Sequence, residues 1–265
     1  MDSETSAVLT LALLVAGAAL LVWRDTRRSP HGLQVWLLHK VTRFFTPFVF
    51  RQRIVPSYFP PEGGGLVIAN HRSPIDPMVI FSLVSLQEGR SRIRRVEFIT
   101  AREYCEIGGA LGFITRNMGV IPVERNGRDM RSVREALRRA KDGRLVGVFP
   151  EGKINTGEGL LPAIPGVAWL ALHAKLPVYP IFIHGALQLG SMVAPFTRFC
   201  RLRVHLGEPI DLSCYQGRKI DQDLLREVTD LLMQRLAETG GVAPAQNTDD
   251  ESSGLRVFDE RAQAG

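Results

Sequence analysis

From Gly65 onward, short and almost wholly apolar runs alternate with longer amphipathic stretches, an order that is typical of layered α/β folds. The runs that predict strands are residues 66–69, 95–100, 120–123, 145–149, 178–183 and 202–206. The stretches that predict helices are residues 78–86, 130–140, 167–174 and 221–238. Because the strands are apolar on both faces, helices should cover both sides of the sheet. We therefore expect an α/β fold with a mixed, mostly parallel sheet covered by helices.

The segment 7–23 carries no charge, and Thr10 is its only polar side chain, so it predicts a membrane helix. Seventeen residues at about 1.5 Å each reach about 25 Å, near the minimum for crossing a hydrocarbon layer of about 30 Å, so spanning and embedding both stay open. A secretory signal is disfavoured because the leading residues are acidic and no small-x-small cleavage site precedes Arg24. We expect a retained transmembrane or embedded anchor.

Basic residues concentrate directly after this segment. Residues 24–53 contain seven basic side chains and one acidic side chain, a net charge of +6. By the positive-inside bias, this cluster predicts that the rest of the chain lies on the cytoplasmic face of the membrane. Within it, residues 33–50 mix large apolar side chains with Lys40 and Arg43 and are interrupted by Pro47. A helix in the lipid interface and an ordinary amphipathic helix packed on the domain fit this pattern equally well.

The composition divides the chain into three parts. With 45% hydrophobic residues the chain can build a proper core, which excludes disorder throughout. We expect an anchor and interfacial helix over 1–53, an α/β domain over 54–239, and a disordered acidic tail over 240–265, where the sequence turns polar and loses its periodicity. The three cysteines lie far apart with no CxxC pair, which argues against a disulfide framework and a zinc site and favours a reducing compartment.

The segment "NHRSPID", residues 70–76, carries the strongest chemical signal. Ser73 can cap a helix, Pro74 suits its first position, and Asp76 follows three residues after the cap. This turn should bring Asp76 back to His71, where a carboxylate on one ring nitrogen leaves the other free to accept a proton. The alternative is a capping aspartate beside a histidine that only forms hydrogen bonds.

This segment resembles the His-x4-Asp motif of the glycerolipid acyltransferase family, which includes 1-acylglycerol-3-phosphate acyltransferases. Three further segments are similar to the family's other motifs, in the same order: "GVIPVER" (119–125), "FPEG" (149–152) and "LPVYPI" (176–181). The resemblance covers roughly residues 65–211. It implies transfer of a fatty acyl group from acyl-CoA or acyl carrier protein to the free hydroxyl of 1-acylglycerol-3-phosphate. The product would be phosphatidic acid, within phospholipid biosynthesis at a membrane.

By this resemblance, His71 is the general base and Asp76 is its partner. The acceptor hydroxyl would attack the acyl thioester directly, without a covalent enzyme intermediate. The sequence agrees with this, because it has no G-x-S-x-G motif and no cysteine lies in one of the four segments. The resemblance implies neither a metal nor a cofactor; the acyl donor is a co-substrate.

The resemblance also implies which side chains bind the acceptor. Arg125 would hold its phosphate, a task that suits the fork of a guanidinium. Arg102 lies near the position where many relatives carry a phosphate-contacting lysine and is a second candidate. For either arginine, a solvated surface position is the alternative.

Glu151 and Gly152 follow the strand at 145–149, and in the family this glutamate helps to position the acceptor; a simple turn is the alternative. Here the sequence departs from the family pattern, because Ile154 replaces an arginine that usually contributes to phosphate binding. Lys153 could restore one positive charge. The departure keeps two alternatives open: a lysophospholipid acyltransferase for another headgroup, and a transacylase similar to tafazzin. A non-catalytic membrane adaptor is a further alternative.

Two other function classes are disfavoured. Residues 147–153 fit the start of a nucleotide-binding P-loop, but Ile154 lacks the hydroxyl that would hold magnesium and Pro150 removes a loop amide. Nucleic-acid binding would explain the basic charge. It would not explain the apolar N-terminal segment, and the sequence has no recognisable nucleic-acid-binding motif. The expected partners are therefore a lipid bilayer, a lysophospholipid and the acyl donor.

Overall fold

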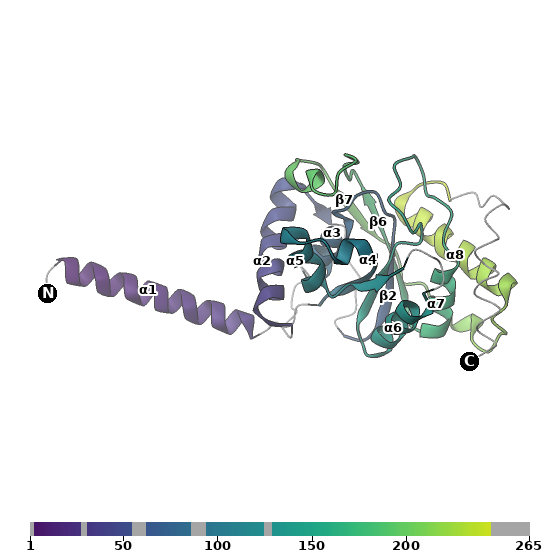
Figure 1. The fold of residues 1–265 in the computed structure, drawn as a ribbon, viewed down its shortest axis with the longest axis horizontal. Helices are drawn as coiled ribbons and strands as arrows, with labels where there is room; N and C mark the ends of the chain where they lie inside the picture. The colour runs from purple at the N-terminus through teal and green to yellow at the C-terminus, as the bar shows by residue number, and fades with distance from the viewer. Residues whose placement is uncertain (1–2, 28–30, 55–61, 86–93, 125–128, 245–265) are drawn as a thin grey trace.

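The structure is a computed structural model that describes residues 3–27, 31–54, 62–85, 94–124 and 129–244. Two helices, α1 (Ser3–Thr26) and α2 (Gly32–Val49), precede a layered domain. Figure 1 shows α1 extending away from this domain, whereas α2 lies against it. The expected division at residues 53 and 54 stays a prediction, since α2 shares a core with the sheet.

One seven-stranded sheet forms the centre of the domain, with the strand order β1-β7-β6-β2-β5-β3-β4. The strands are β1 (Arg53–Ile54), β2 (Gly65–Ala69), β3 (Val96–Ala101), β4 (Ile121–Val123), β5 (Leu145–Val148), β6 (Val178–His184) and β7 (Arg203–Leu206). The β6–β7 pair is antiparallel and the other paired strands run parallel. The predicted mixed, mostly parallel sheet is confirmed, and each predicted strand is present.

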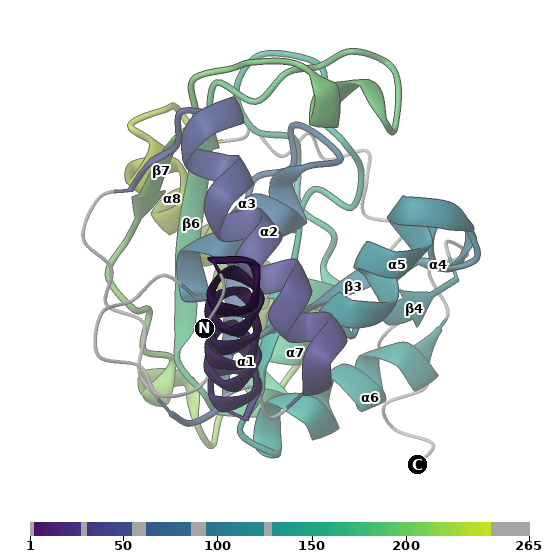
Figure 2. The same cartoon turned by 90° about the vertical axis from the view of Figure 1, so that its left-hand side faces the viewer.

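Helices cover both faces of the sheet (Figures 1 and 2). They are α3 (Asp76–Ser85), α4 (Arg102–Cys105), α5 (Gly109–Met118), α6 (Met130–Lys141), α7 (Gly166–Ala174) and α8 (Gln222–Gly240), with short 3₁₀ helices η1 (Ala194–Thr197) and η2 (Ser213–Tyr215). In β2, Leu66 and Ile68 face the core under α6, α7 and α8, whereas Val67 and Ala69 face the core that includes α2 and α3. All four are fully buried, as the apolar strand predicts.

The helix α2 passes through Pro47 and ends at Val49, so the predicted interruption at Pro47 is wrong. The proline lies in the last turn, where losing one amide donor removes only one helical hydrogen bond. Val35 and Leu38 on one face of α2 are buried, whereas Phe44 and Phe48 on another are 70% and 63% exposed. The helix therefore packs on the domain, as one interpretation predicted, and still has an unpacked apolar face.

The helix α1 has 24 residues, and several of its large apolar side chains, among them Leu13 and Leu20, are exposed. Across the described ranges, no helix combines the length and apolarity that crossing a membrane requires, so the expected transmembrane helix over 7–23 is not found. At the other end, α8 continues to Gly240, where the predicted tail begins, and residues 245–265 of that tail lie outside the described residues.

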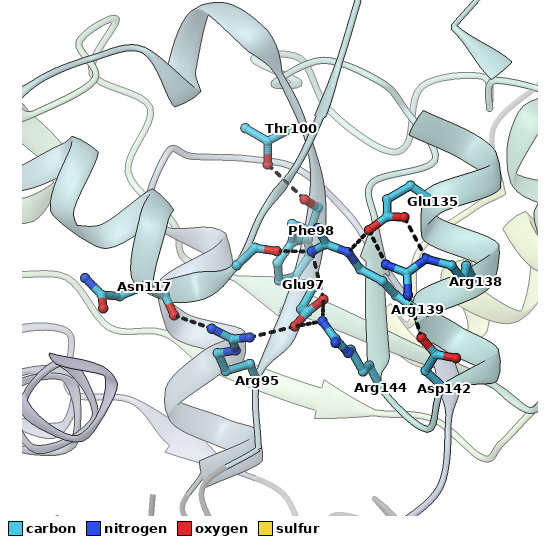
Figure 3. A network of polar contacts seen from close by, with 11 residues as sticks. Arg95, Glu97, Phe98, Thr100, Asn117, Glu135, Arg138, Arg139, Asp142 and Arg144 are labelled. Atoms are coloured by element: carbon cyan, nitrogen blue, oxygen red, sulfur yellow. Dashed lines mark hydrogen bonds and ion pairs between the residues drawn. The ribbon is translucent and has the colours of Figure 1, made fainter. Parts of the chain in front are cut away.

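A buried carboxylate ties three elements together at one end of the sheet (Figure 3). Glu97 in β3 is 1% exposed. Its oxygens accept from Arg95 at 2.9 Å, from Arg139 of α6 at 2.9 Å and from Arg144 at 3.4 Å. Burial lowers the pKa of Arg95, and the neighbouring Glu97 opposes that shift. This network joins β3 to α6 and to the residue that precedes β5.

Candidate active site

Asn70 fixes the backbone at the point where β2 ends. Its side chain is fully buried and forms two hydrogen bonds with one residue of the neighbouring strand β6. The Nδ2 group donates to the carbonyl of Ile183 at 3.0 Å, and Oδ1 accepts from the amide of Ile183 at 2.7 Å. The next residue, His71, therefore leaves the sheet from a defined position.

His71 and Asp76 form the predicted pair. The distance from His71 Nδ1 to Asp76 Oδ2 is 3.0 Å, and Asp76 is fully buried at the start of α3. The same oxygen accepts from the backbone amides of Arg72 and Ser73, both at 2.7 Å. The expected cap is reversed: Asp76 caps the amide of Ser73, while the Ser73 hydroxyl has no partner among the described residues.

The imidazole of His71 packs against one aromatic ring, and a second ring stacks behind the first. His71 stacks on Phe149 with a centroid separation of 4.0 Å and an interplanar angle of 12°, and Phe149 stacks on Phe98 of β3 at 4.9 Å and 14°. The His71 side chain is 17% exposed. With Nδ1 bonded to Asp76 and the ring confined by stacking, Nε2 is the nitrogen available to a substrate.

Glu151 supports the backbone of His71 from behind. Its Oε1 accepts from the His71 amide at 2.9 Å, and its Oε2 accepts from Asn155 Nδ2 at 2.8 Å and from the Leu161 amide at 3.0 Å. The Asn155 amide in turn donates to the His71 carbonyl at 2.7 Å. The loop after β5 thus holds both backbone groups of His71, and the Glu151 carboxylate is buried and occupied by protein donors.

Sequence reasoning missed the roles of Phe149, Phe98 and Asn155. Phe149 stands in the "FPEG" segment beside Glu151, so its position was a usable signal. Phe98 and Asn155 carried no such signal, because their contacts with this site depend on how β3 and the loop after β5 are placed.

The other expected binding residues are distributed around this loop and the end of β3. Gly152 adopts φ +66°, and an added Cβ there would lie 2.0 Å from Ile164 Cδ1, so a larger residue would be strained at this position. Lys153 is exposed and forms no ion pair with a described residue. Arg102 begins α4 and forms an exposed ion pair with Glu124. Arg125 lies outside the described residues.

The described ranges contain no group of three or more His, Cys, Asp or Glu side chains arranged to hold a metal ion. The cysteines Cys105, Cys200 and Cys214 are free thiols. Burial raises the pKa of Cys200 to about 11, so this thiol stays protonated and is a poor nucleophile near neutral pH. The His71–Asp76 pair is suited to base catalysis by an imidazole, supported by a carboxylate.

Comparisons with known proteins give one family. A family model described as "Acyltransferase" matches residues 52–184, half of the chain. A 1-acyl-sn-glycerol-3-phosphate acyltransferase from Haemophilus influenzae is 26% identical over 180 residues, which cover 65% of this chain and 68% of that protein. The protein of the same name from Escherichia coli is 25% identical over 187 residues, with 66% and 68% covered.

The fold has a counterpart among solved structures. A crystal structure of the 1-acyl-sn-glycerophosphate (LPA) acyltransferase from Thermotoga maritima superposes with a TM-score of 0.56 at 21% sequence identity. The match covers 79% of this chain and 82% of that one. At this identity, the likeness establishes the shared fold and leaves the activity to be argued from the site.

Proposed function

The chain belongs to the acyltransferase family, and from that membership we propose that it transfers a fatty acyl group from a thioester to the free hydroxyl of 1-acylglycerol-3-phosphate, giving phosphatidic acid. Two relatives that match two thirds of the chain carry this activity in their names. The observation that carries the proposal is the His71–Asp76 pair at 3.0 Å, with the second ring nitrogen of His71 unbonded within the described chain.

The reaction needs only groups of this chain and its two substrates. His71 Nε2 accepts the proton of the acceptor hydroxyl as the oxygen attacks the carbonyl carbon of the thioester. The new C–O bond forms, the C–S bond breaks, and the leaving sulfur takes the proton back from the imidazolium. Asp76 holds the ring in the required tautomer and stabilises the imidazolium between these steps. The products are an ester and a free thiol.

We assign the acceptor's phosphate to Arg125, with Lys153 and Arg102 as further candidates. Glu151 acts in this scheme through His71, whose amide it binds, rather than through the acceptor. Because Ile154 stands where relatives carry an arginine, acceptors with other headgroups are the second candidates, and the same assay tests them.

We also propose that the enzyme works at a membrane surface, where its lipid substrate resides. The exposed face of α2 supports this, because Leu37, Val41, Phe44 and Phe48 lie on it, with Lys40 and Arg43 on the same helix. Apolar side chains with adjacent cations favour an interface with anionic lipid headgroups. The cytoplasmic orientation stays a prediction from the basic residues after α1.

The test is an acyl-transfer assay with the purified full-length chain, labelled acyl-CoA and a panel of lysophospholipids. We expect phosphatidic acid from 1-acylglycerol-3-phosphate at the highest kcat/KM, and a loss of about 10²- to 10⁴-fold in kcat for His71→Ala. His173→Ala is the matched control, since His173 bonds Trp169 within α7 and should not affect transfer. Preference for another headgroup would replace the proposed acceptor. Transfer from an intact phospholipid without a thioester would indicate a transacylase, and membrane binding without transfer would indicate an adaptor.

A further inference from the structure

Four arginines gather where β1, β7 and the end of β6 meet. The strand register places Arg53 of β1 opposite Arg203 of β7, and Arg203 opposite His184 of β6. Arg51 and Arg201 lie two residues before Arg53 and Arg203, and all four arginine side chains are exposed. Like charges directly opposite each other on neighbouring strands destabilise a sheet. This arrangement therefore costs folding stability unless something else balances it.

No carboxylate of the described chain balances these charges. Several exposed arginines elsewhere have carboxylate partners: Arg102 with Glu124, Arg138 with Glu135, Arg218 with Glu227 and Arg235 with Glu238. Within the described ranges, Arg51, Arg53, Arg201 and Arg203 form no ion pair. A local conflict of this kind is expected where a protein binds a ligand of opposite charge.

These side chains line two hollows that adjoin, since both are bounded by Arg201 and Arg203. One has a volume of about 290 Å³ and the other of about 430 Å³. We call them together the arginine pocket; its lining residues are Arg51, Arg53, His184, Gly185, Arg201, Leu202, Arg203 and His205. These volumes fall in the range of sites that bind small molecules.

The two histidines give the pocket a wall of flat rings. His184 Nε2 lies 3.0 Å from the carbonyl of Gly240 at the end of α8, and the rings of His184 and His205 meet edge to face at 5.2 Å. Burial lowers the pKa of His184, so this ring adds no like charge near neutral pH. Guanidinium groups suit phosphates, and flat rings beside them suit a nucleobase.

The pocket lies close to the catalytic pair. Ile183, which precedes His184, is bonded to Asn70, which precedes His71. The strands β6 and β2 that carry these residues are neighbours in the sheet, about 4.8 Å apart. The charge of Arg72 contributes to the lowered pKa of His184. A ligand in the pocket could therefore extend a flexible arm to His71.

We propose that the arginine pocket binds the phosphorylated nucleotide of a coenzyme A thioester and so serves as the acyl-donor subsite of this enzyme. The inference rests on the proposed acyl transfer and deepens it. The phosphates contact the arginines, the base lies against the histidine rings, and the pantetheine arm carries the thioester toward His71. An acyl carrier protein lacks this nucleotide and would leave the pocket unfilled.

Calorimetric titration of the full chain with adenosine 3′,5′-bisphosphate tests the site without catalysis. We expect saturable binding of the nucleotide. The double substitution Arg53→Gln, Arg203→Gln should weaken it about tenfold or more, since each substitution removes a charged hydrogen bond to a phosphate. The matched control is Arg218→Gln, Arg235→Gln, which removes two arginines that have carboxylate partners and should leave the Kd within about twofold. Absence of binding to the wild-type chain, or equal binding by the pocket variant, overturns the proposal.

Steady-state kinetics give a second readout. In the pocket variant, the KM for acyl-CoA should rise about tenfold or more, while kcat and the KM for the lysophospholipid stay unchanged. An acyl-pantetheine donor, which lacks the nucleotide, should show no difference between variant and wild type. If the wild type bound the nucleotide but transferred no acyl group, the proposed function would be refuted and the nucleotide site would not. If the wild type transferred acyl groups but the variant showed no change in KM for acyl-CoA, the nucleotide site alone would be refuted.

Two further measurements separate the pocket from other roles. The pocket variant should melt at no lower Tm than the wild type, because it removes a like-charge pair; a large drop would show that the arginines stabilise the fold and would contradict the inference. If the variant instead lost binding to vesicles of phosphatidylglycerol while nucleotide binding persisted, the arginines would serve lipid headgroups and the proposal would fail.

Discussion

Asp76 has two oxygens in very different situations. Oδ2 accepts three hydrogen bonds, from His71 and from the amides of Arg72 and Ser73, whereas Oδ1 is buried with no partner among the described residues. One carboxylate oxygen therefore both orients the imidazole and closes the turn that begins α3. The effect of the Asp76 charge on catalysis and the effect of its hydrogen bonds on the turn can therefore be tested with separate substitutions.

Asp76→Asn should keep the turn and lose the catalytic effect of the charge. The amide oxygen can replace Oδ2 as acceptor, with its NH2 group at the unpaired Oδ1 position. We expect kcat to fall about 10²- to 10⁴-fold, with a change in unfolding free energy of about 1 kcal/mol or less. Asp76→Ala is the comparison, because it leaves two amides unbonded and should also cost about 1–3 kcal/mol per orphaned group. Full activity in the Asn variant would remove Asp76 from the mechanism.

The pairing of His71 with Asp76 could be predicted because both residues lie in one turn of seven residues. The support of His71 by Glu151 could not, since these residues are 80 positions apart and meet only when β2 and β5 are adjacent. The same holds for the stack on Phe98, which comes from a third strand. Contacts within one turn can thus be predicted from a sequence, whereas predicting contacts between strands requires knowledge of the strand order.

At the level of elements, the predicted strands and helices were those with long apolar or amphipathic patterns. Two of the missed elements are β1 and α5. The strand β1 has two residues and exists by pairing with β7. The helix α5 begins after Gly108 without a side-chain cap, so the usual start signal is absent. Both are held by tertiary contacts rather than by local preference.

The Glu97 network links β3, α6 and the start of β5, and its removal should destabilise the whole sheet. We expect Glu97→Gln to lower the free energy of unfolding by about 3 kcal/mol, because three arginines then face one another around a buried, uncharged amide. Urea denaturation monitored by circular dichroism measures this change. An unaltered unfolding midpoint would show that the network contributes nothing to stability.

Glu135 offers a control on the same helix, since it also pairs with Arg139 but is partly exposed. Glu135→Gln should cost about 1 kcal/mol or less. Hydrogen bonds from Arg138 and then Arg139 lower the pKa of Glu135 to about 2 from its ordinary 4.5. Its contribution is therefore complete above about pH 4.5 and is lost as the pH falls toward 2, so wild type and variant should converge in stability at the acid end.

Across the whole molecule, the His71–Asp76 pair and the proposed donor pocket lie on neighbouring strands of the sheet, and α2 packs on the same domain. His71 follows β2, Glu151 follows β5, and the arginine pocket adjoins the end of β6. Figure 2 shows α2 crossing the face of the domain, with α1 continuing toward the viewer. The sequence predicted the α/β fold and the mixed, mostly parallel sheet. It could not show whether protein or lipid covers the apolar face of a helix, because both give the same sequence pattern.

The proposed membrane association can be tested on the exposed apolar face of α2, which carries Phe44 and Phe48. The rings of Phe44 and Phe48 lie 4.8 Å apart and are largely exposed, so replacing them should not disturb the core. Phe44→Glu, Phe48→Glu should reduce co-sedimentation with phosphatidylglycerol vesicles about tenfold or more, since each phenyl ring lost from the interface removes about 1 kcal/mol or more of apolar burial. Transfer to a short-chain, water-soluble lysophospholipid should persist, because His71 and Asp76 are untouched.

The matched control is Phe44→Leu, Phe48→Leu, which keeps this face of α2 apolar and should retain most vesicle binding. If the Glu variant sedimented like the wild type, α2 would not be the membrane-contacting element. If both variants also lost activity on the soluble substrate, the apolar face of α2 would be needed for the fold of the site rather than for binding to the lipid surface. Reduced turnover on vesicles alone, with equal turnover in solution, is the pattern expected of an enzyme that meets its lipid substrate through this helix.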